Sequence, residues 1–379
     1  MAASGLEIEV VRDLGRFREL KPEWDLLLAG MGGEASVFLS HYWHDCWWRH
    51  FGRDAEMRLM VLRRGGKAAA IVPLMRRRFS LYGLAVRCLC FPENGNTLHN
   101  DLLIGETGRR EELLAEIFSH LYRNQQEWDL LHLYRMPADS PNLSAALTLL
   151  GAPGKAKSHH LRSVYASPYL EIAGGWDAFH AGRSVRVRKT LRNIRNSLAR
   201  GGRPDLIRIE SWEEFLEHRE GLYRVARHSW TEELGDSLAT PANRAFFEDL
   251  ARSASGAGGL RAWLLLLDGR PAAFEFHLRG FGKQHALRAS FDPEFAPLSP
   301  GGFLEMEILK ELFDEPQGVE RFDFGGSNDL YKRRWSEQAR ELVLLQVFNP
   351  RLYSRLCAFH ATSLIPLLRG VRDRLRRKG

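Results

Sequence analysis

The chain of 379 residues is 44% hydrophobic and 27% charged, and its formal net charge at pH 7 is +7. This composition is typical of a soluble globular protein, and the length exceeds that of one ordinary core, so two domains are expected. The positive net charge favours an anionic partner, such as a phosphate-bearing cofactor, RNA or a lipid surface.

Patterns along the chain argue against three classes of protein. Residues 1–10 lack the basic and apolar regions of a secretory signal, and no apolar run approaches the length of a membrane span. The four cysteines provide neither a disulfide framework nor a CxxC pair, as is usual in a reducing compartment. These features predict a cytoplasmic protein.

The first half of the chain predicts strands and helices in mixed order. Alternating apolar and acidic residues at 6–11 indicate a half-buried strand, and apolar residues at helical spacing indicate helices at 16–29 and 38–51. The remaining predicted elements are strands at 57–62, 67–76, 86–91 and 102–104, a helix at 110–122, a strand at 129–134, a helix at 142–150 and a strand at 163–172.

Two histidines in the second predicted helix could suggest a metal site. His41 and His44 stand three positions apart among aromatic residues, a spacing that can hold a metal. Because no third ligand is evident, packing or a substrate-lining role is favoured, and no metal site is predicted.

The same order of elements returns in the second half. The predicted elements are a strand at 206–209, helices at 212–230 and 242–254, a hairpin of strands at 261–267 and 271–279, a strand at 284–291, a helix at 303–313, a strand at 319–324, a short helix at 328–335 and a strand at 342–348. The halves share element order rather than residues, which predicts a structural repeat. The expected fold is α+β, with domains at 1–175 and 176–350 and a tail at 351–379.

A basic helix is predicted between the halves, at 183–200. Val187, Leu191, Ile194 and Leu198 form one apolar stripe along it, and arginines and a lysine crowd the flanks. One interpretation is a docked helix with a solvated basic face. The alternative is a clamp for phosphates or RNA, because like charges without acidic partners repel one another.

The tail at 351–379 is amphipathic and ends in a basic run. Packing against the second domain is the favoured interpretation. Peripheral contact with an anionic membrane surface, on the inner face of the membrane, is the alternative.

A turn of small residues precedes the predicted helix at 303–313. Backbone N–H groups at the start of a helix have no helical acceptor and can hold a phosphate or a developing anion. The residues that would form such a seat are Ser299, Gly301, Gly302 and Phe303. The alternative is an ordinary turn before a helix.

The second half resembles the GNAT acyltransferases. The resemblance rests on Asp292-Pro293 after a strand, on 298–301 leading into a helix, and on Asp323-Phe324-Gly325 followed by Tyr331-Lys332. These motifs resemble the CelD-type branch, associated with bacterial cellulose and exopolysaccharide synthesis, which is similar to the Fem-type aminoacyltransferases. The resemblance implies two tandem GNAT-like domains and an acyl-CoA donor held by Leu298, Ser299, Gly301, Gly302 and Phe303. The turn 297–302 departs from the Gln/Arg-x-x-Gly-x-Gly/Ala pattern of ordinary GNAT enzymes.

Acyl transfer to an amine or hydroxyl needs a base, a place for the oxyanion and an acid for the leaving group. Asp292 and Glu275 are the candidate bases; Asp292 could instead cap its turn, and Glu275 lies in an otherwise apolar strand. Asp323 is expected to orient the site or to hold the following Gly-Gly turn.

The resemblance gives roles to two further residues. Tyr331 would protonate the leaving thiolate and Lys332 would support the charge of the intermediate, although a surface Lys-Arg-Arg run is the alternative interpretation. Candidate substrate-binding residues are His285, Arg288, His44, His99 and Asp101.

The predicted function is an acyl-CoA-dependent N- or O-acyltransferase that works by direct attack, in bacterial polysaccharide or cell-envelope biosynthesis. No GxSxG or similar nucleophile motif predicts a covalent acyl-enzyme. One alternative is a Fem-like transferase that uses aminoacyl-tRNA, with RNA contacting 183–200. Another is a catalytically silent GNAT-fold partner of an envelope-biosynthesis complex.

Overall fold

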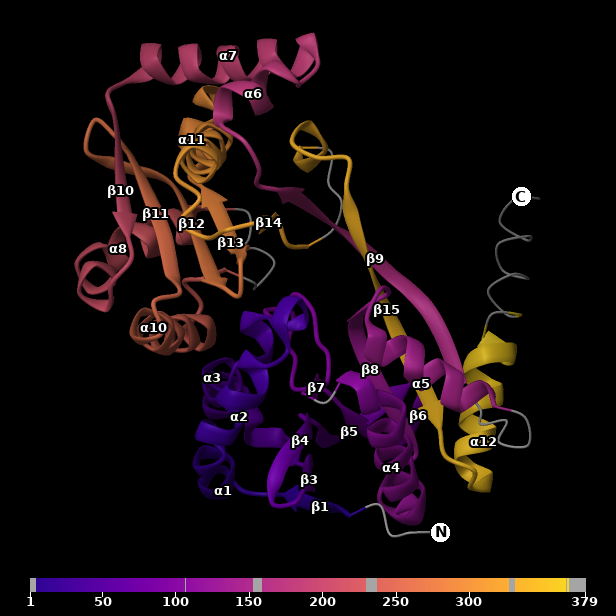
Figure 1. The fold of residues 1–379 in the computed structure, drawn as a ribbon. Helices are drawn as coiled ribbons and strands as arrows, with labels where there is room; N and C mark the ends of the chain where they lie inside the picture. The colour runs from indigo at the N-terminus through magenta and orange to yellow at the C-terminus, as the bar shows by residue number, and fades with distance from the viewer. Residues whose placement is uncertain are drawn as a thin grey trace. The chain divides into compact units, whose positions relative to one another are not determined.

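The computed structural model describes residues 5–105, 107–152, 159–229, 237–326, 331–365 and 367. It divides into two units, one made of residues 1–165 with 340–379 and the other of residues 166–339. Figure 1 shows the elements of both units along the chain. The predicted helix end at 230, the start of the short helix at 328 and the basic run near the C-terminus lie outside the described residues.

The first unit contains two sheets. The first has the order β1-β3-β4-β7 and is antiparallel throughout; its strands are β1 (Leu6–Val11), β3 (Leu59–Arg64), β4 (Lys67–Val72) and β7 (Leu103–Ile104). The second has the order β15-β8-β6-β5-β2, with β6 and β8 parallel; its strands are β15 (Ala339–Phe348), β8 (Leu130–Pro137), β6 (Leu84–Cys90), β5 (Met75–Leu81) and β2 (Glu56–Met57).

Strand β3 is apolar on both faces because it separates two cores. Leu59 and Val61 pack with the aromatic core around Trp24, whereas Leu62 belongs to the core that includes Leu113. This explains a continuous apolar run where a half-exposed strand would alternate. The helices around these cores are α1 (Leu14–Glu19), α2 (Lys21–Ala29), α3 (His41–Phe51), α4 (Arg110–Arg123), α5 (Pro141–Gly151) and α12 (Leu352–Phe359).

The C-terminal residues 340–365 pack with the first unit. Leu345 and Val347 of β15 are buried in one of its cores, and Cys357 of α12 is buried in the other. The sequence predicts β15 in the second domain and α12 in a separate tail, whereas antiparallel pairing of β15 with β8 and the burial of Cys357 join them to the first unit. Among the described residues, no helix is long and apolar enough to cross a membrane.

The second unit is built on a mixed sheet with the order β10-β11-β12-β13-β14-β9. Its neighbours pair antiparallel except β13 and β14, which are parallel. The strands are β10 (Pro204–Ile209), β11 (Leu260–Leu267), β12 (Arg270–Gly280), β13 (Lys283–Phe291), β14 (Arg321–Asp323) and the C-terminal residues of β9 (His159–Glu171).

Helices cover both faces of this sheet (Figure 1). On one face, Phe215 and Phe247 pack edge-on against Phe276 of β12. On the other, Leu304 belongs to the core that contains Trp263 of β11. The first face carries α8 (Trp212–His228) and α10 (Pro241–Gly256), and the second carries α6 (Trp176–Ala181), α7 (Val185–Gly201) and α11 (Pro300–Asp314).

Helix α7 corresponds to the predicted basic helix. Leu191, Ile194 and Leu198 are buried as the apolar stripe predicts, and Val187 is half-buried. A Cβ at Gly201 would lie 2.4 Å from the methyl groups of Leu298, so the last residue of the helix is a glycine where another segment approaches closely.

Candidate active site

Strands β13 and β14 separate after a short parallel contact. They pair only at Lys283 with Arg321, Gln284 with Phe322 and His285 with Asp323. Strand β14 ends at Asp323, whereas β13 continues to Phe291. Beyond this point the backbone groups of β13 on this side are not paired with β14.

Asp323 lies where the two strands separate. Its carboxylate accepts hydrogen bonds from Ser167 Oγ at 3.1 Å and from the Gly325 N–H at 2.8 Å. His285 Nδ1 lies 3.6 Å from the other carboxylate oxygen, so the structure brings these two predicted residues together. Gly325 has a φ of +61° and Gly326 of +59°, which a residue with a side chain adopts at a cost. Asp323 thus holds the Gly-Gly turn, one of the two roles predicted for it.

Lys332 is buried although it begins a Lys-Arg-Arg run. It opens the short 3₁₀ helix η7 (Lys332–Arg334) with only 5% of its surface exposed. Its ammonium donates a hydrogen bond of 2.5 Å to the Gly325 carbonyl oxygen. A Cβ at Gly326 would lie 3.3 Å from Lys332 Nζ, so the turn held by Asp323 gives the ammonium its space. A buried ammonium is unlike the solvated charge of a surface run.

Two buried carboxyl groups accompany this ammonium. Burial raises the pKa of Glu275 to about 8, and the charge of Lys332 opposes that shift. Burial and the charge of Glu275 raise the pKa of Glu305 to about 8, against a hydrogen bond of 2.5 Å from Trp335 Nε1. The two carboxyls and Lys332 therefore form one electrostatic group between β12, α11 and η7.

A hydrogen-bonded chain orients Glu275 from the sheet side. Burial lowers the pKa of His277 to about 3, so its imidazole is neutral. Gln284 Nε2 lies 3.0 Å from His277 Nδ1, and His277 Nε2 lies 2.7 Å from Glu275 Oε2. Since the amide nitrogen of Gln284 can only donate, Nδ1 of His277 accepts, and the ring proton is assigned to Nε2, where it points to the carboxyl of Glu275. These hydrogen bonds explain why Glu275 and His277 occupy the otherwise apolar strand β12.

We expect the stability of the protein to fall as pH rises from about 4.5 to about 8. The raised pKa values of Glu275 and Glu305 mean that the folded chain keeps protons that the unfolded chain releases near its ordinary value of 4.5. This stabilising contribution is complete below that value and is lost as pH passes the folded pKa. Glu305→Gln should flatten the slope by on the order of 1 kcal/mol or more across the window.

Urea unfolding at a series of pH values measures this slope. Glu307→Gln, which alters a half-exposed carboxyl of the same helix, is the matched control. Equal slopes in the wild-type protein and in Glu305→Gln would contradict the assignment of a proton to this buried group.

A second polar pair joins β13 to α8. Asp292 is 5% exposed and its Oδ2 lies 2.7 Å from Nδ1 of His228, while Oδ1 accepts the Glu294 N–H at 3.0 Å. Burial opposes ionisation of Asp292, but these hydrogen bonds outweigh it and lower its pKa. The imidazole side chain of His228 is 52% exposed. A buried carboxylate that holds one nitrogen of an accessible imidazole leaves the other nitrogen to accept a proton.

The predicted catalytic residues thus fall into two groups, whose partners lie on different helices. Glu275 and Lys332 lie with Glu305 of α11, whereas Asp292 contacts the last residue of α8. Arg288 lies on the α10 side of the sheet, with its guanidinium 5.8 Å from the centre of the Phe247 ring. Tyr331 is 46% exposed, and its ring centre is 5.5 Å from Lys332 Nζ.

The turn at 298–303, predicted to hold the acyl carrier, has two features: it leaves backbone amides without a helical acceptor, and it packs against α7. Ser299 has a φ of +55°, and its carbonyl accepts the Phe303 N–H at 3.0 Å, so that amide is occupied. Gly301 and Gly302, in the first turn of α11, have no helical acceptor for their N–H groups. A Cβ at Gly302 would lie 3.2 Å from Ile194 Cδ1, so α7 also requires a small residue here.

Three predicted substrate-binding residues belong to the first unit, where His44 and His99 are buried and Asp101 is half-buried. His44 packs 5.2 Å from the Trp24 ring, and burial lowers its pKa to about 3. His99 lies edge-on to Phe38 at 5.0 Å. The carboxylate of Asp101 accepts the side-chain amide of Asn142 at 2.9 Å, and burial raises its pKa. Their contacts account for them as structural residues of that unit; their proposed substrate role stays a prediction.

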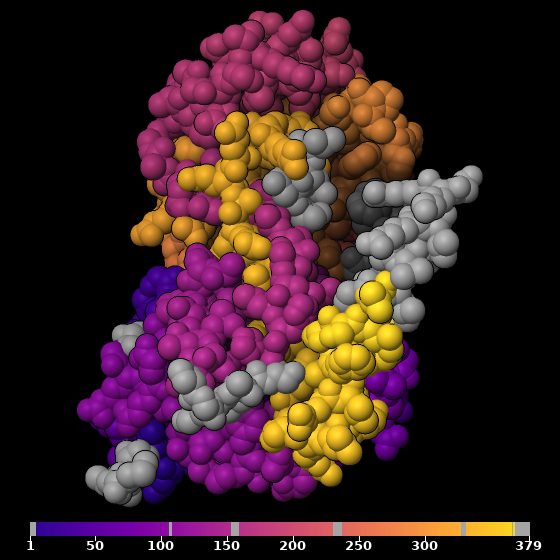
Figure 2. Space-filling view, turned by 90° about the vertical axis from the view of Figure 1, so that its right-hand side faces the viewer, coloured from indigo at the N-terminus to yellow at the C-terminus, as the bar shows by residue number. Residues whose placement is uncertain are grey.

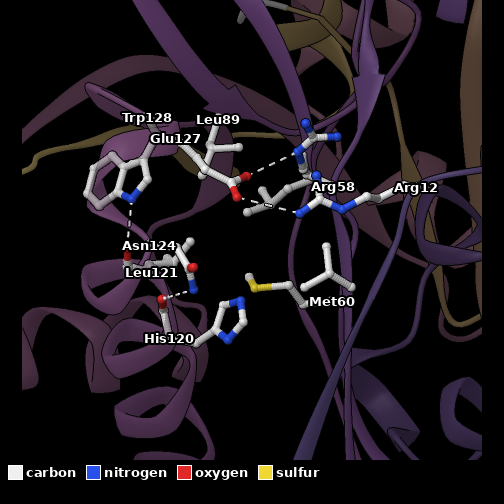
Figure 3. A pocket seen from close by; sticks show the side chains of 11 residues that line it. Arg12, Arg58, Met60, Leu89, His120, Leu121, Asn124, Glu127 and Trp128 are labelled. Carbon is white, nitrogen blue, oxygen red and sulfur yellow. Dashed lines mark hydrogen bonds and ion pairs between the residues drawn. The ribbon is translucent and has the colours of Figure 1, made fainter.

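A small pocket of about 100 Å³ also lies in the first unit. Figure 3 shows that Glu127 points toward two arginines there. Glu127 is 3.5 Å from both Arg12 and Arg58, and the neighbouring Trp128 Nε1 donates to the Leu121 carbonyl at 2.8 Å. The polar groups around the pocket are therefore largely engaged with one another.

Two functional candidates, His228 and Glu305, were missed by sequence reasoning. Glu305 could have been found, because it shares a helical face with the apolar Leu309 and Leu312, where a carboxyl needs a partner. His228 has no such signal: its partner Asp292 is 64 residues away in the chain and the contact depends on the fold.

A family of known proteins matches the part of the chain that contains both groups of candidate residues. Residues 185–333 match the model of a family described as an acetyltransferase (GNAT) domain. No match was found among curated proteins.

Solved structures with a similar fold span most of the chain. FemX superimposes with a TM-score of 0.58 at 12% identity, covering 89% of this chain and 98% of FemX. The C-terminal domain of a putative lysylphosphatidylglycerol synthetase from Agrobacterium fabrum superimposes with a TM-score of 0.54 at 12% identity, covering 90% of this chain and 94% of that domain. A tandem GNAT protein from the clavulanic acid biosynthesis pathway superimposes with a TM-score of 0.51 at 13% identity, covering 91% of this chain and 100% of that protein. These likenesses confirm the predicted α+β fold, which the chain shares with a tandem GNAT protein, and residues 185–333 are similar to a GNAT acetyltransferase domain.

Proposed function

We propose that the protein transfers an acyl group from an acyl-CoA to an amine or hydroxyl acceptor by direct attack. The observation that carries this proposal is the buried ammonium of Lys332 beside the place where β13 and β14 separate, inside the matched GNAT domain. A fixed cation in a water-poor site stabilises a developing oxyanion much more than it would in water.

In the proposed reaction, the acceptor loses its proton to His228 and attacks the thioester carbonyl. Asp292 holds Nδ1 of His228, so Nε2 is the nitrogen that accepts the proton. This arrangement makes Asp292 the orienting group rather than the base, since its lowered pKa makes it a weak base. An imidazole that the sequence did not reveal is thereby added to the candidate bases.

The tetrahedral intermediate then collapses with the charge of its oxygen offset by Lys332. The carbon–sulfur bond breaks, the acyl–nitrogen or acyl–oxygen bond remains, and the thiolate takes a proton. Tyr331 is the proposed acid, because its half-exposed phenol neighbours Lys332. The free amides of Gly301 and Gly302 are the proposed contacts for carrier phosphates.

The acceptor class is proposed from the resemblance of the 292–332 motifs to the CelD-type branch. It would be a sugar or cell-envelope precursor in bacteria, acted on in the cytoplasm or at the inner face of the membrane. A second candidate, transfer from aminoacyl-tRNA, is favoured by the exposed arginines of α7 and by the fold shared with FemX.

Isothermal titration calorimetry with acetyl-CoA and with tRNA, together with an assay for free thiol, tests which donor the protein uses. We expect acetyl-CoA to bind with a dissociation constant in the micromolar range and to release free thiol when an amine acceptor is present. Binding of tRNA that weakens steeply with salt, without any acetyl-CoA binding, would reverse the choice of donor. Thiol release without an acceptor is the control for simple thioester hydrolysis.

A further inference from the structure

A second concave site lies on the outer side of α11, in the second unit. Helices α6, α7 and α11 enclose a groove of about 610 Å³. In Figure 2, α7 lies at the surface at the top of the view. The groove borders Met306, Glu307 and Lys310, which follow the first turn of α11 by one to two helical turns. It is therefore separate from the amides proposed to contact the acyl carrier.

Positive charge dominates this groove. Arg188, Lys189, Arg192 and Arg195 of α7 line it together with Lys310, against only two acidic residues, Asp177 and Glu307. Within the described part of the chain, no ion pair joins the α7 cations of the groove to a carboxylate. Arg188, Arg192 and Arg195 recur at helical spacing and repel one another when no anion is present.

The groove also has an apolar side. Leu191 and Met306 line it with Trp176, whose ring stacks on His180 at 5.8 Å between ring centres. A bare inorganic ion would use the cations and leave this side unused. A ligand with phosphates at one end and an aromatic or apolar body at the other matches both sides.

We propose that this groove binds an organic diphosphate, such as a nucleoside diphosphate or a compound built on one. Its volume is in the range of small-molecule sites, and the arginine row from 188 to 195 spans about 10 Å, enough for adjacent phosphates and the group next to them. A nucleic acid backbone would be expected to use all of the exposed arginines of α7. Arg186 and Arg200 are exposed but do not line the groove.

A matched pair of double variants tests the proposal with ADP as the probe. Arg188→Gln with Arg192→Gln removes two charges inside the groove, and Arg186→Gln with Arg200→Gln removes two from the same helix outside it. Isothermal titration should show ADP affinity at least about 10-fold weaker in the groove variant and within about 2-fold of wild type in the control. Circular dichroism melting confirms that both variants fold.

Three results would overturn the proposal. They are no binding of ADP by the wild-type protein, equal losses in the two double variants, and binding of single-stranded RNA that both variants weaken equally while ADP does not compete. The last two would indicate a diffuse basic surface that follows a nucleic acid strand.

Competition distinguishes the sources of the diphosphate. If ADP displaces acetyl-CoA, and acetyl-CoA binding weakens in the groove variant, the diphosphate belongs to the acyl donor, and the groove replaces the Gly301 and Gly302 amides as its phosphate contact. If ADP and acetyl-CoA bind together, it belongs to a second ligand, such as a nucleotide-activated acceptor. Both results support the groove, and ADP binding remains measurable if the proposed acetyl transfer fails.

Discussion

A Lys332→Met variant is expected to lose about 10²- to 10³-fold in kcat while remaining folded. Methionine keeps most of the length and apolar character of the lysine stem but removes the ammonium. In the proposed reaction that ammonium opposes the negative charge of the intermediate, which exists only at the transition state and after it. The loss should therefore appear in kcat, with little change in KM for the acyl donor.

The neighbouring Arg333→Met variant is the matched control, because Arg333 is exposed in the same short helix. Its kcat should stay within about 2-fold of wild type. Lys332→Met also removes the charge that holds down the pKa of Glu275, so its melting temperature must be measured in parallel. Full activity in a folded Lys332→Met protein would rule out the proposed role of the ammonium.

Loss of His228 should produce an effect of similar size with a different signature. We expect His228→Ala to lower kcat/KM by about 10²- to 10⁴-fold, as removal of a general base does. The loss should shrink as pH rises, because an acceptor amine that is already deprotonated needs less help. Asp292→Asn should weaken the reaction as well, since an amide cannot stabilise the imidazolium that forms.

The comparison of these two variants decides which residue is the base. If His228→Ala retains activity and Asp292→Asn does not, the carboxylate itself takes the proton. His218→Ala, which changes a histidine elsewhere on α8, controls for general effects on this helix. Its pH profile should match that of the wild-type protein.

Local sequence patterns were sufficient for much of the second unit. The apolar stripe of α7 and the β12 hairpin with its internal Glu275 depend on residues close in the chain, and periodicity identified them. The burial of Lys332 could not be foreseen, because the Lys-Arg-Arg run has the composition of a surface segment. Its burial follows from the glycine turn that Asp323 holds.

Two further features could not be predicted because they depend on contacts between residues far apart in the sequence. The position of β15 beside β8 could not be deduced from its own apolar run, because any sheet edge offers such a strand the same hydrogen bonds. The contact between His228 and Asp292 likewise arises only when α8 packs on β13. Both features need the three-dimensional arrangement of segments that lie far apart in the sequence.

The order of synthesis has a consequence for how this chain folds. Residues 166–339 form a unit from one continuous stretch, whereas the other unit needs residues 1–165 and also 340–379. On a ribosome, the continuous unit can complete its sheet first, while the earlier-made residues still lack β15 and the buried face of α12. Residues 1–165 therefore keep part of their apolar surface uncovered until residues 340–379 have been made, long after the sheet of the continuous unit can be complete.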